Sequence, residues 1–242
     1  EYARRIAQVL DCADRLGMVV IVGLFYWVSL PRMQGEDAIR RAAHTALDWL
    51  AETGHANLLI EVANEVDVVY DRTGVEILGP ARVHEMVREL KVAHPEMLIS
   101  TSGGGAQVRT GRGMPSGDLV AASDYVLLHG NGTRPPELEA AIRAVREYPE
   151  YERDPKPVLI NEDSPAVPNL EAAWRNYASW GYYDQGFEGQ AEDPYVHYAP
   201  RPRWANAPLE ELNGFQTPPV NWGINTPFKE AFFSRVAEIT GA

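Results

Sequence analysis

Two kinds of segment alternate along the chain: amphipathic stretches at helical spacing, and short runs that are apolar throughout. The first pair is Tyr2–Leu16, which predicts a helix, and Met18–Trp27, which is typical of a strand buried on both faces. The second pair is Asp37–Thr53 and Asn57–Asn64, and a glycine follows the helix in both pairs. The apolar face expected for the first helix consists of Ile6, Val9, Leu10, Ala13 and Leu16. The pattern therefore predicts a repeated unit of helix followed by strand.

Four further units continue this order. They are helix Arg82–His94 with strand Met97–Ser102, helix Gly117–Ser123 with strand Asp124–His129, helix Glu137–Tyr148 with strand Pro157–Asp163, and helix Leu170–Ser179 with strand Trp180–Asp184, before a last helix at Thr226–Ile239. Six apolar strands, each preceded by a helix, predict an α/β fold in which helices cover a parallel sheet. Regular alternation favours a (β/α)8 TIM barrel over a doubly wound sheet. We expect strands three to eight of one barrel domain, residues 1–242, with the first two βα units missing before Glu1.

Composition narrows the class of protein. Apolar residues make up 45% of the 242 residues and charged residues 23%, which is the balance of a globular chain. The formal net charge is -12 and the basic residues are scattered, so we expect no nucleic-acid partner. The longest apolar run, Met18–Trp27, is too short to span a bilayer, so no membrane partner is expected. Cys12 is the single cysteine and forms no intrachain disulfide, which leaves the compartment unknown.

The candidate chemistry lies at the ends of the predicted strands. In barrels of this kind the reactive groups stand where strands end, on the face built by the βα loops. Two of these ends carry Asn followed by Glu, namely Asn64-Glu65 and Asn161-Glu162. Glycoside hydrolysis needs two carboxylates, because one protonates the leaving oxygen while the other attacks the anomeric carbon or activates water. Counted as strands four and seven, these strands are expected to point Glu65 and Glu162 inward from opposite sides of the barrel mouth.

A family resemblance rests on the same two strands. The sequences EVANE (residues 61–65) and KPVLINED (residues 156–163) resemble the fourth and seventh strands of clan A glycoside hydrolases. They are most similar to glycoside hydrolase family 5, the cellulase and mannanase group, and the likeness runs from about Gly17 to the end of the chain. The resemblance implies a retaining enzyme that cleaves a β-linked oligosaccharide or polysaccharide. It implies that Glu65 is the general acid/base, that Glu162 is the nucleophile, and that Asn64 contacts the sugar 2-hydroxyl.

The resemblance also predicts the electrostatics of the pair. Retaining enzymes hold their two carboxyls roughly 5 Å apart. At such a distance an ionised Glu162 is expected to raise the pKa of Glu65 and keep it protonated for its first step. The family resemblance is compatible with a secreted or periplasmic location, while the sequence itself leaves localisation and oligomeric state unknown.

Other strand ends supply candidate substrate contacts. His129 and Asn131 end the strand that precedes Glu162, where His129 is either a core histidine or a contact of the substrate or of Glu162. Glu61 lies on the same side of its strand as Glu65 and is interpreted as structural, because an unpaired buried charge is costly. No cluster of His, Cys and acidic residues has metal-ligand spacing, so no metal and no cofactor are predicted. Aromatic side chains that are either ordinary core or rim residues or platforms for sugar rings are Tyr26, Trp27, Tyr183 and Trp222.

The chain departs from the family pattern at several positions. Val66 stands where the family usually has proline, Phe25-Tyr26-Trp27 where it usually has histidine, and the strand-eight tryptophan has no clean counterpart. Two alternatives therefore stay open: a non-catalytic carbohydrate-binding barrel, and a different, metal-dependent barrel enzyme that uses Asp163 and His129. The segment Glu188–Pro219 is expected to be a long loop that shapes the site. The sugar and the linkage are not readable from the sequence.

Overall fold

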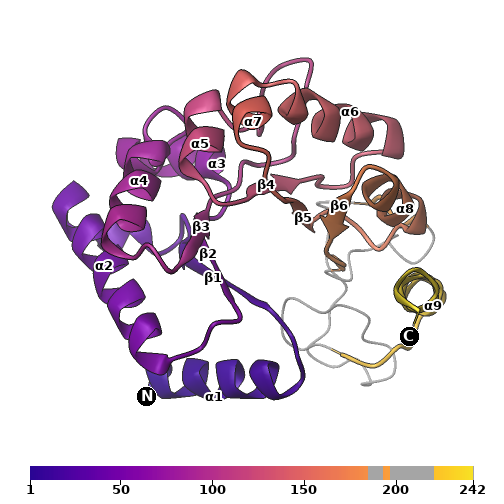
Figure 1. The fold of residues 1–242 in the computed structure, drawn as a ribbon, viewed down its shortest axis with the longest axis horizontal. Helices are drawn as coiled ribbons and strands as arrows, with labels where there is room; N and C mark the ends of the chain where they lie inside the picture. Colours follow the sequence, from indigo (N-terminus) through magenta and orange to yellow (C-terminus); the bar gives the residue numbers. More distant parts are fainter. Residues whose placement is uncertain (185–192, 197–220, 242) are drawn as a thin grey trace. The chain divides into compact units, whose positions relative to one another are not determined.

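The computed structural model describes residues 1–184, 193–196 and 221–241 (Figure 1). Its elements in chain order are α1 (Tyr2–Arg15), β1 (Val20–Phe25), η1 (Leu30–Arg32), α2 (Glu36–Thr53), β2 (Leu58–Ala63), α3 (Val66–Thr73), η2 (Glu76–Leu78), α4 (Val83–Ala93), β3 (Leu98–Ser100), α5 (Gly117–Ala122), β4 (Val126–His129), α6 (Pro135–Arg146), α7 (Pro149–Arg153), β5 (Val158–Glu162), α8 (Val167–Arg175), β6 (Ala178–Trp180) and α9 (Pro227–Thr240). They fall into two compact units. The first comprises Glu1–Gly104, Pro115–Leu127 and Arg146–Pro157, and the second comprises Gly105–Met114, Leu128–Val145 and the described residues from Val158 onward.

The first unit is built on the parallel sheet β1-β2-β3. Its register pairs Val20 with Leu58 and Leu59 with Leu98. β2 is the central strand, and all of its residues except Leu59 are buried, which explains why the strand is almost entirely apolar. Because the strands are parallel, their carboxyl ends lie at the same edge of the sheet, and the residues that follow Ala63 and Ser100 are neighbours there.

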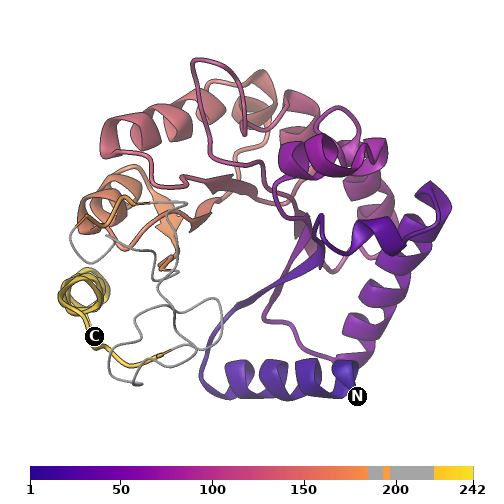
Figure 2. The same cartoon turned by 180° about the vertical axis from the view of Figure 1, so that it is seen from behind.

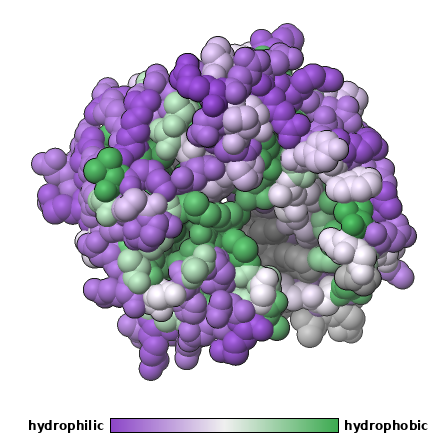
Figure 3. All heavy atoms as spheres, in the orientation of Figure 1, coloured by the Kyte–Doolittle hydropathy of each residue, from purple (hydrophilic) through white to green (hydrophobic). Residues whose placement is uncertain are grey.

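Helices α2 and α4 pack side by side in this unit (Figure 1). Their apolar stripes are buried, with Leu47 and Leu50 on α2 and Leu90 on α4 in the hydrophobic core. Burial of such a stripe supplies most of the stability of a helix, since isolated helices of this length are marginal in water. Arg40 of α2 forms an ion pair with Glu89 of α4 at the surface between them. Hydrophilic residues cover much of the outer surface of these helices in Figure 3.

The second unit contains β5 and β6 with the end of β4, in the strand order β4-β5-β6. The pairing of β5 with β6 is parallel and sets Val158 opposite Ala178 and Ile160 opposite Trp180. The buried stripe of α6 consists of Leu138, Ala141, Ile142 and Val145. The loop of residues 105–114 runs beside α6, as Figure 2 shows from behind.

This order confirms the predicted fold class. Six described strands occur, each preceded by a helix, and the pairings of β1 with β2, β2 with β3 and β5 with β6 are parallel. Gly54 ends α2 in the left-handed conformation with φ 74°, as its position predicts. The described residues form two three-stranded sheets and no closed barrel, so the chain presents part of a (β/α)8 arrangement.

The first predicted helix and strand are less buried than expected. In α1 only Leu10 and Ala13 are buried, whereas Val9 and Leu16 are more than half exposed. β1 begins at Val20, and Phe25 is its one buried residue, so the expectation of a strand buried on both faces is wrong. Apolar character allows burial, but the elements that pack against a segment decide it.

The boundary between α8 and β6 also differs from the prediction. The helix ends at Arg175 and the strand spans Ala178–Trp180, so Ser179 belongs to the strand and the expected strand Trp180–Asp184 is wrong. The reason is local, because Tyr177 adopts a positive φ of 49°, which a helix cannot continue through. Helices α3 and α7 were not predicted. α7 lies in the charged, proline-containing segment between the predicted helix Glu137–Tyr148 and the predicted strand Pro157–Asp163.

None of the described helices combines the length and the apolar character needed to cross a membrane. The predicted loop Glu188–Pro219 lies outside the described residues, apart from residues 193–196.

Candidate active site

Asn64 and Glu65 connect the central strand β2 to helix α3. The N–H of Asn64 donates to the carbonyl oxygen of Phe25 (3.0 Å), which continues the pairing of β1 with β2 past the end of the strand. Glu65 then turns the backbone with φ 56° and ψ 69°, and its carbonyl accepts the N–H of Val69 (2.8 Å) in the first turn of α3. This left-handed conformation costs a residue other than glycine roughly 1–2 kcal/mol. Such strain clusters at functional sites.

Two hydroxyl residues that follow β3 hold this turn. Thr101 Oγ1 accepts the N–H of Ala63 (3.1 Å) and donates to its carbonyl oxygen (2.6 Å). Ser102 Oγ accepts the N–H of Glu65 (3.0 Å), and the Ser102 carbonyl accepts the N–H of Val66 (2.9 Å). These bonds fix the backbone on both sides of Glu65, so they fix the direction in which its side chain leaves the chain.

The Glu65 side chain is buried beside a second glutamate and a glycine. Glu65 is 7% exposed and Glu61 is 5% exposed. Ser102 donates its hydroxyl to the Glu61 carboxylate while accepting from the backbone of Glu65, so one serine contacts both glutamates. A Cβ at Gly104 would lie 3.4 Å from the carboxyl carbon of Glu65 and 3.0 Å from Val68 Cγ2. The absence of a side chain at Gly104 therefore leaves room for the Glu65 carboxyl.

Glu162 is the last residue of β5, in the second unit. Its carbonyl oxygen accepts the N–H groups of Gly130 (2.8 Å) and Asn131 (3.4 Å), which tie the ends of β4 and β5 together. His129 ends β4 and is fully buried, with Nδ1 at 3.7 Å from Glu162 Oε2. The Glu162 side chain keeps 18% of its surface exposed. Glu162 is thus held by its backbone, contacts a buried imidazole, and keeps part of its side chain exposed.

Asp163 follows Glu162 and points into the interior of the second unit. Its Oδ2 accepts hydrogen bonds from Ser164 Oγ (2.7 Å) and Asn169 Nδ2 (2.6 Å). Burial raises the pKa of Asp163 to about 7, although these two hydrogen bonds and nearby His129 act to lower it. A Cβ at Gly130 would lie 1.6 Å from Asp163 Oδ1, so only glycine fits at that position beside this carboxyl. Asp163 thereby packs directly under the segment that joins His129 to Asn131.

The remaining predicted contacts differ in exposure. Asn131 is partly buried and has a positive φ of 49°, one of three such residues other than glycine among those described. Tyr26 is 48% exposed, and its ring lies 5.7 Å from that of Trp27, over which the Arg72 guanidinium stacks at 4.3 Å. Both aromatic residues follow β1, at the sheet edge where Asn64 follows β2.

Tyr183 and Trp222 differ in their exposure to solvent. Tyr183 is 7% exposed, whereas Trp222 is 77% exposed. The turn that carries Trp222 is held by buried Lys229 of α9, whose Nζ donates to the carbonyl oxygens of Asn221 (2.8 Å) and Gly223 (3.1 Å). The ring of Trp222 is therefore presented on a fixed turn.

The structure brings the candidates together in two sets. Tyr26, Trp27, Asn64 and Glu65 lie at the carboxyl-end edge of the sheet in the first unit, and His129, Asn131 and Glu162 lie at the strand ends of the second. Sequence reasoning missed the supporting residues Ser102, Gly130 and Asn169. The Ser-Thr-Ser run that closes an apolar strand was a usable signal for Ser102. Nothing local marks Asn169, because its partner Asp163 is recognisable only in the fold.

Comparison of the sequence with protein-family models and with curated proteins found no match. Solved structures of similar fold include the endo-1,4-β-D-mannanase from Thermotoga petrophila RKU-1, with a TM-score of 0.55 and 14% identity over 98% of this chain and 80% of the mannanase chain. The glycoside hydrolase family 17 β-1,3-glucanosyltransferase from Rhizomucor miehei aligns with a TM-score of 0.48 and 14% identity over 81% of this chain and 76% of its own.

The likeness to the mannanase shows that this chain has the fold of TIM-barrel glycosidases. At the level of fold, it confirms the resemblance to clan A glycoside hydrolases that EVANE and KPVLINED predict. At such identity it assigns no activity and no catalytic residue.

Proposed function

We propose that this protein is a retaining glycoside hydrolase that cleaves a β-linked glycan with Glu65 and Glu162. The observation that carries the proposal is the position of the two glutamates in a glycosidase fold. Each stands where a buried parallel strand ends, on backbone fixed by hydrogen bonds from the neighbouring strand end. Strand ends are where barrels of this kind hold their reactive groups.

The mechanism has two steps. In the first, the Glu162 carboxylate attacks the anomeric carbon and the bond to the leaving oxygen breaks, while the Glu65 carboxylic acid gives its proton to that oxygen. In the second, Glu65 removes a proton from water, the water oxygen bonds to the anomeric carbon, and the Glu162 carboxylate is released. Asn64 is assigned a hydrogen bond to the sugar 2-hydroxyl, which lies next to the reacting carbon. Such a hydrogen bond strengthens in the transition state.

Properties of both strand ends support these roles. A nucleophile has to be ionised and reachable, and Glu162 is the partly exposed carboxylate beside a buried imidazole. A group that gives and takes a proton has to keep one orientation through both steps. The strained and hydrogen-bonded turn at Glu65 provides such an orientation.

The test is turnover of a glycan panel by matched variants. β-1,4-Mannan is the first substrate to try, because the mannanase of similar fold acts on it, followed by other β-linked glucans and mannans. Glu65→Gln and Glu162→Gln keep the shape of each side chain and remove its acid chemistry. Each is expected to lower kcat by at least about 100-fold. Glu52→Gln, on the exposed surface of α2, is the control and is expected to keep full activity.

Azide distinguishes the two roles. A small anionic nucleophile needs no general base, so azide is expected to restore turnover to Glu65→Ala with retained configuration, and to act on Glu162→Ala with inversion. Full activity of either Gln variant on every glycan tested would overturn the proposal. Binding of glycans without any turnover by the unmodified protein would instead support the non-catalytic barrel, and metal-dependent turnover would support the metal enzyme.

A further inference from the structure

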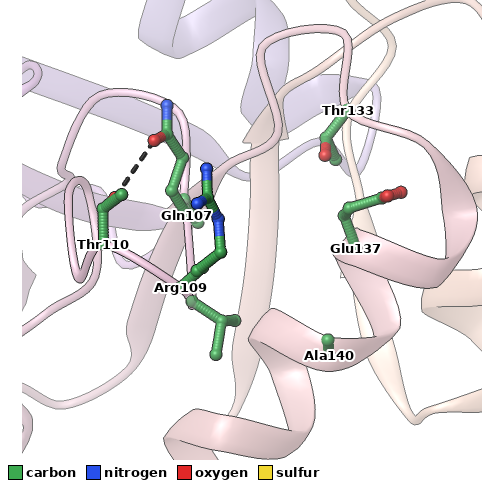
Figure 4. A pocket seen from close by; sticks show the side chains of 8 residues that line it. Gln107, Arg109, Thr110, Thr133, Glu137 and Ala140 are labelled. Carbon is green, nitrogen blue, oxygen red and sulfur yellow. Dashed lines mark hydrogen bonds between the residues drawn. The ribbon is translucent and has the colours of Figure 1, made fainter.

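A separate pocket lies in the second unit, between the loop of residues 105–114 and helix α6 (Figure 4). Its volume is about 430 Å³, which is within the range of small-molecule sites. Gln107 and Arg109 stand on the loop side, and Thr133 and Glu137 stand on the other side. None of these residues belongs to the candidate active site.

The pocket adjoins the strand end that carries His129 and Asn131. The N–H of Ala106 donates to the His129 carbonyl (2.7 Å), so the loop is bonded to the end of β4. A Cβ at Gly105 would lie 3.3 Å from Asn131 Cβ, which shows that the loop passes close against that residue. A ligand that extends from the end of β4 along this loop therefore reaches the pocket.

The polar groups of the pocket suit hydroxyl groups. Arg109 is a donor and Glu137 is an acceptor, and neither has an ion-pair partner among the described residues. Gln107 accepts a hydrogen bond from Thr110 at Oε1 (3.0 Å), which orients its amide and leaves the NH₂ group as a donor. Apolar side chains, namely Ala106, Val108 and Ala140, complete the lining and can contact the C–H face of a sugar ring.

The charges favour a neutral ligand. The guanidinium of Arg109 and the carboxylate of Glu137 together give the pocket no net charge. An anionic uronic acid or phosphate would be repelled by Glu137, and a cationic amino sugar would be repelled by Arg109. Sugar hydroxyls both donate and accept, and so they satisfy both charged groups at once. We propose that this pocket is a remote subsite that binds a neutral sugar unit of the glycan away from the bond that is cleaved. This inference rests on the proposed function. It adds that the affinity for the glycan depends on the number of sugar units.

The test is calorimetric binding of manno-, cello- and laminari-oligosaccharides of two to six units to the protein carrying Glu162→Gln, which removes turnover. Added to this background, Arg109→Ala is expected to raise Kd for the longest bound oligosaccharide about tenfold, as loss of one charge-assisted hydrogen bond predicts, and to leave the disaccharide unchanged. Ala140→Phe, which fills the pocket, is expected to do the same. Arg143→Ala, exposed on the same helix but outside the pocket, is the control and is expected to change neither.

Each outcome is decisive. Equal effects on short and long chains, no effect on either, no binding of any oligosaccharide, or tighter binding of a uronic-acid oligosaccharide would overturn the subsite. Binding does not depend on turnover, so the two proposals can fail separately. If the unmodified protein hydrolyses no glycan while Arg109→Ala weakens binding of the longest chain, the subsite stands and the hydrolase proposal fails.

Discussion

The Nδ1 atom of His129 lies 3.7 Å from Oε2 of Glu162, and the imidazole that carries it is fully buried. This separation is longer than a hydrogen bond and short enough for a favourable ionic contact when the ring is protonated. His129 therefore acts on the orientation and charge of Glu162 in our account, and is a positioning residue.

Replacement of His129 by Gln is expected to lower kcat about 10-fold or more and to leave KM within a few-fold, because the contact serves the attacking carboxylate and not the binding of the ground state. It is also expected to move the acidic limb of the pH profile of kcat. Steady-state kinetics across pH measures both effects. His84→Gln on α4 is the matched control. A change of KM alone, or an unchanged pH profile, would show that His129 only fills the core.

The left-handed backbone conformation of Glu65 leads to a specific prediction for the stability of variants at this position. Because φ is 56°, Glu65→Gly is expected to be more stable than Glu65→Ala by about 1 kcal/mol, although both variants lose the carboxyl and the activity. At exposed Asp71 in α3 the order should reverse, with Ala about 1 kcal/mol more stable than Gly. Urea unfolding of the four variants measures this difference. Equal stabilities at Glu65 would mean that the strained turn is absent in solution.

Asp163 should make stability depend on pH. Its folded pKa is raised to about 7, above the ordinary value of about 3.9, so between these two values the folded state binds a proton that the unfolded state has released. This contribution is fully present below about pH 4 and is lost as pH rises toward 7, at up to about 1.4 kcal/mol per pH unit.

Asp163→Asn keeps an oxygen acceptor for Ser164 and Asn169 but cannot ionise. The unfolding free energy of this variant is expected to lack the decrease that the unmodified protein shows as pH rises from 4 to 7. The Asp14→Asn variant, changed at an exposed position on α1, should still show that decrease. Denaturant unfolding at several pH values provides the comparison. Identical pH dependence in the Asp163→Asn variant and the unmodified protein would contradict a buried, protonated Asp163.

Gly130 should tolerate no side chain while Asp163 is present. A Cβ there would lie 1.6 Å from Asp163 Oδ1, so Gly130→Ala is expected to cost about 1–3 kcal/mol of stability. Gly23→Ala, whose nearest neighbour would be Glu61 Oε2 at 3.8 Å, is the control and is expected to cost less. Adding Asp163→Ala should relieve much of the Gly130→Ala penalty. A fully additive double mutant would show that the two residues do not touch.

Five of the six strand positions were predictable, because a parallel strand inside an α/β fold is mostly apolar, and β2 and the first three residues of β5 follow this rule, whereas β6 lies before its predicted position. Helix α3 was not predictable, since three valines among its residues favour strands and the turn at Glu65 starts it. Burial of β1 was overestimated because local sequence does not reveal which elements pack against a strand.

The candidate glutamates were predictable from their place after apolar runs, but their support was not. Ser102 and Glu61 are 41 positions apart in the sequence, and Gly130 meets Asp163 only where two strands end together. Such contacts depend on the fold, so no local sequence pattern predicts them. The pocket lined by Arg109 and Glu137 likewise forms only where separate segments of the chain come together in the fold.

The most direct test of the central claim is to trap the covalent intermediate. A 2-deoxy-2-fluoro glycoside with a good leaving group, made from whichever sugar the protein cleaves, slows release of the enzyme-bound sugar, and peptide mass spectrometry then locates it. We expect the added mass on the peptide that contains Glu162, and none in the Glu162→Gln variant. Attachment to another residue, or continued turnover of the natural glycan with inversion and no adduct, would contradict a retaining mechanism with Glu162 as the nucleophile.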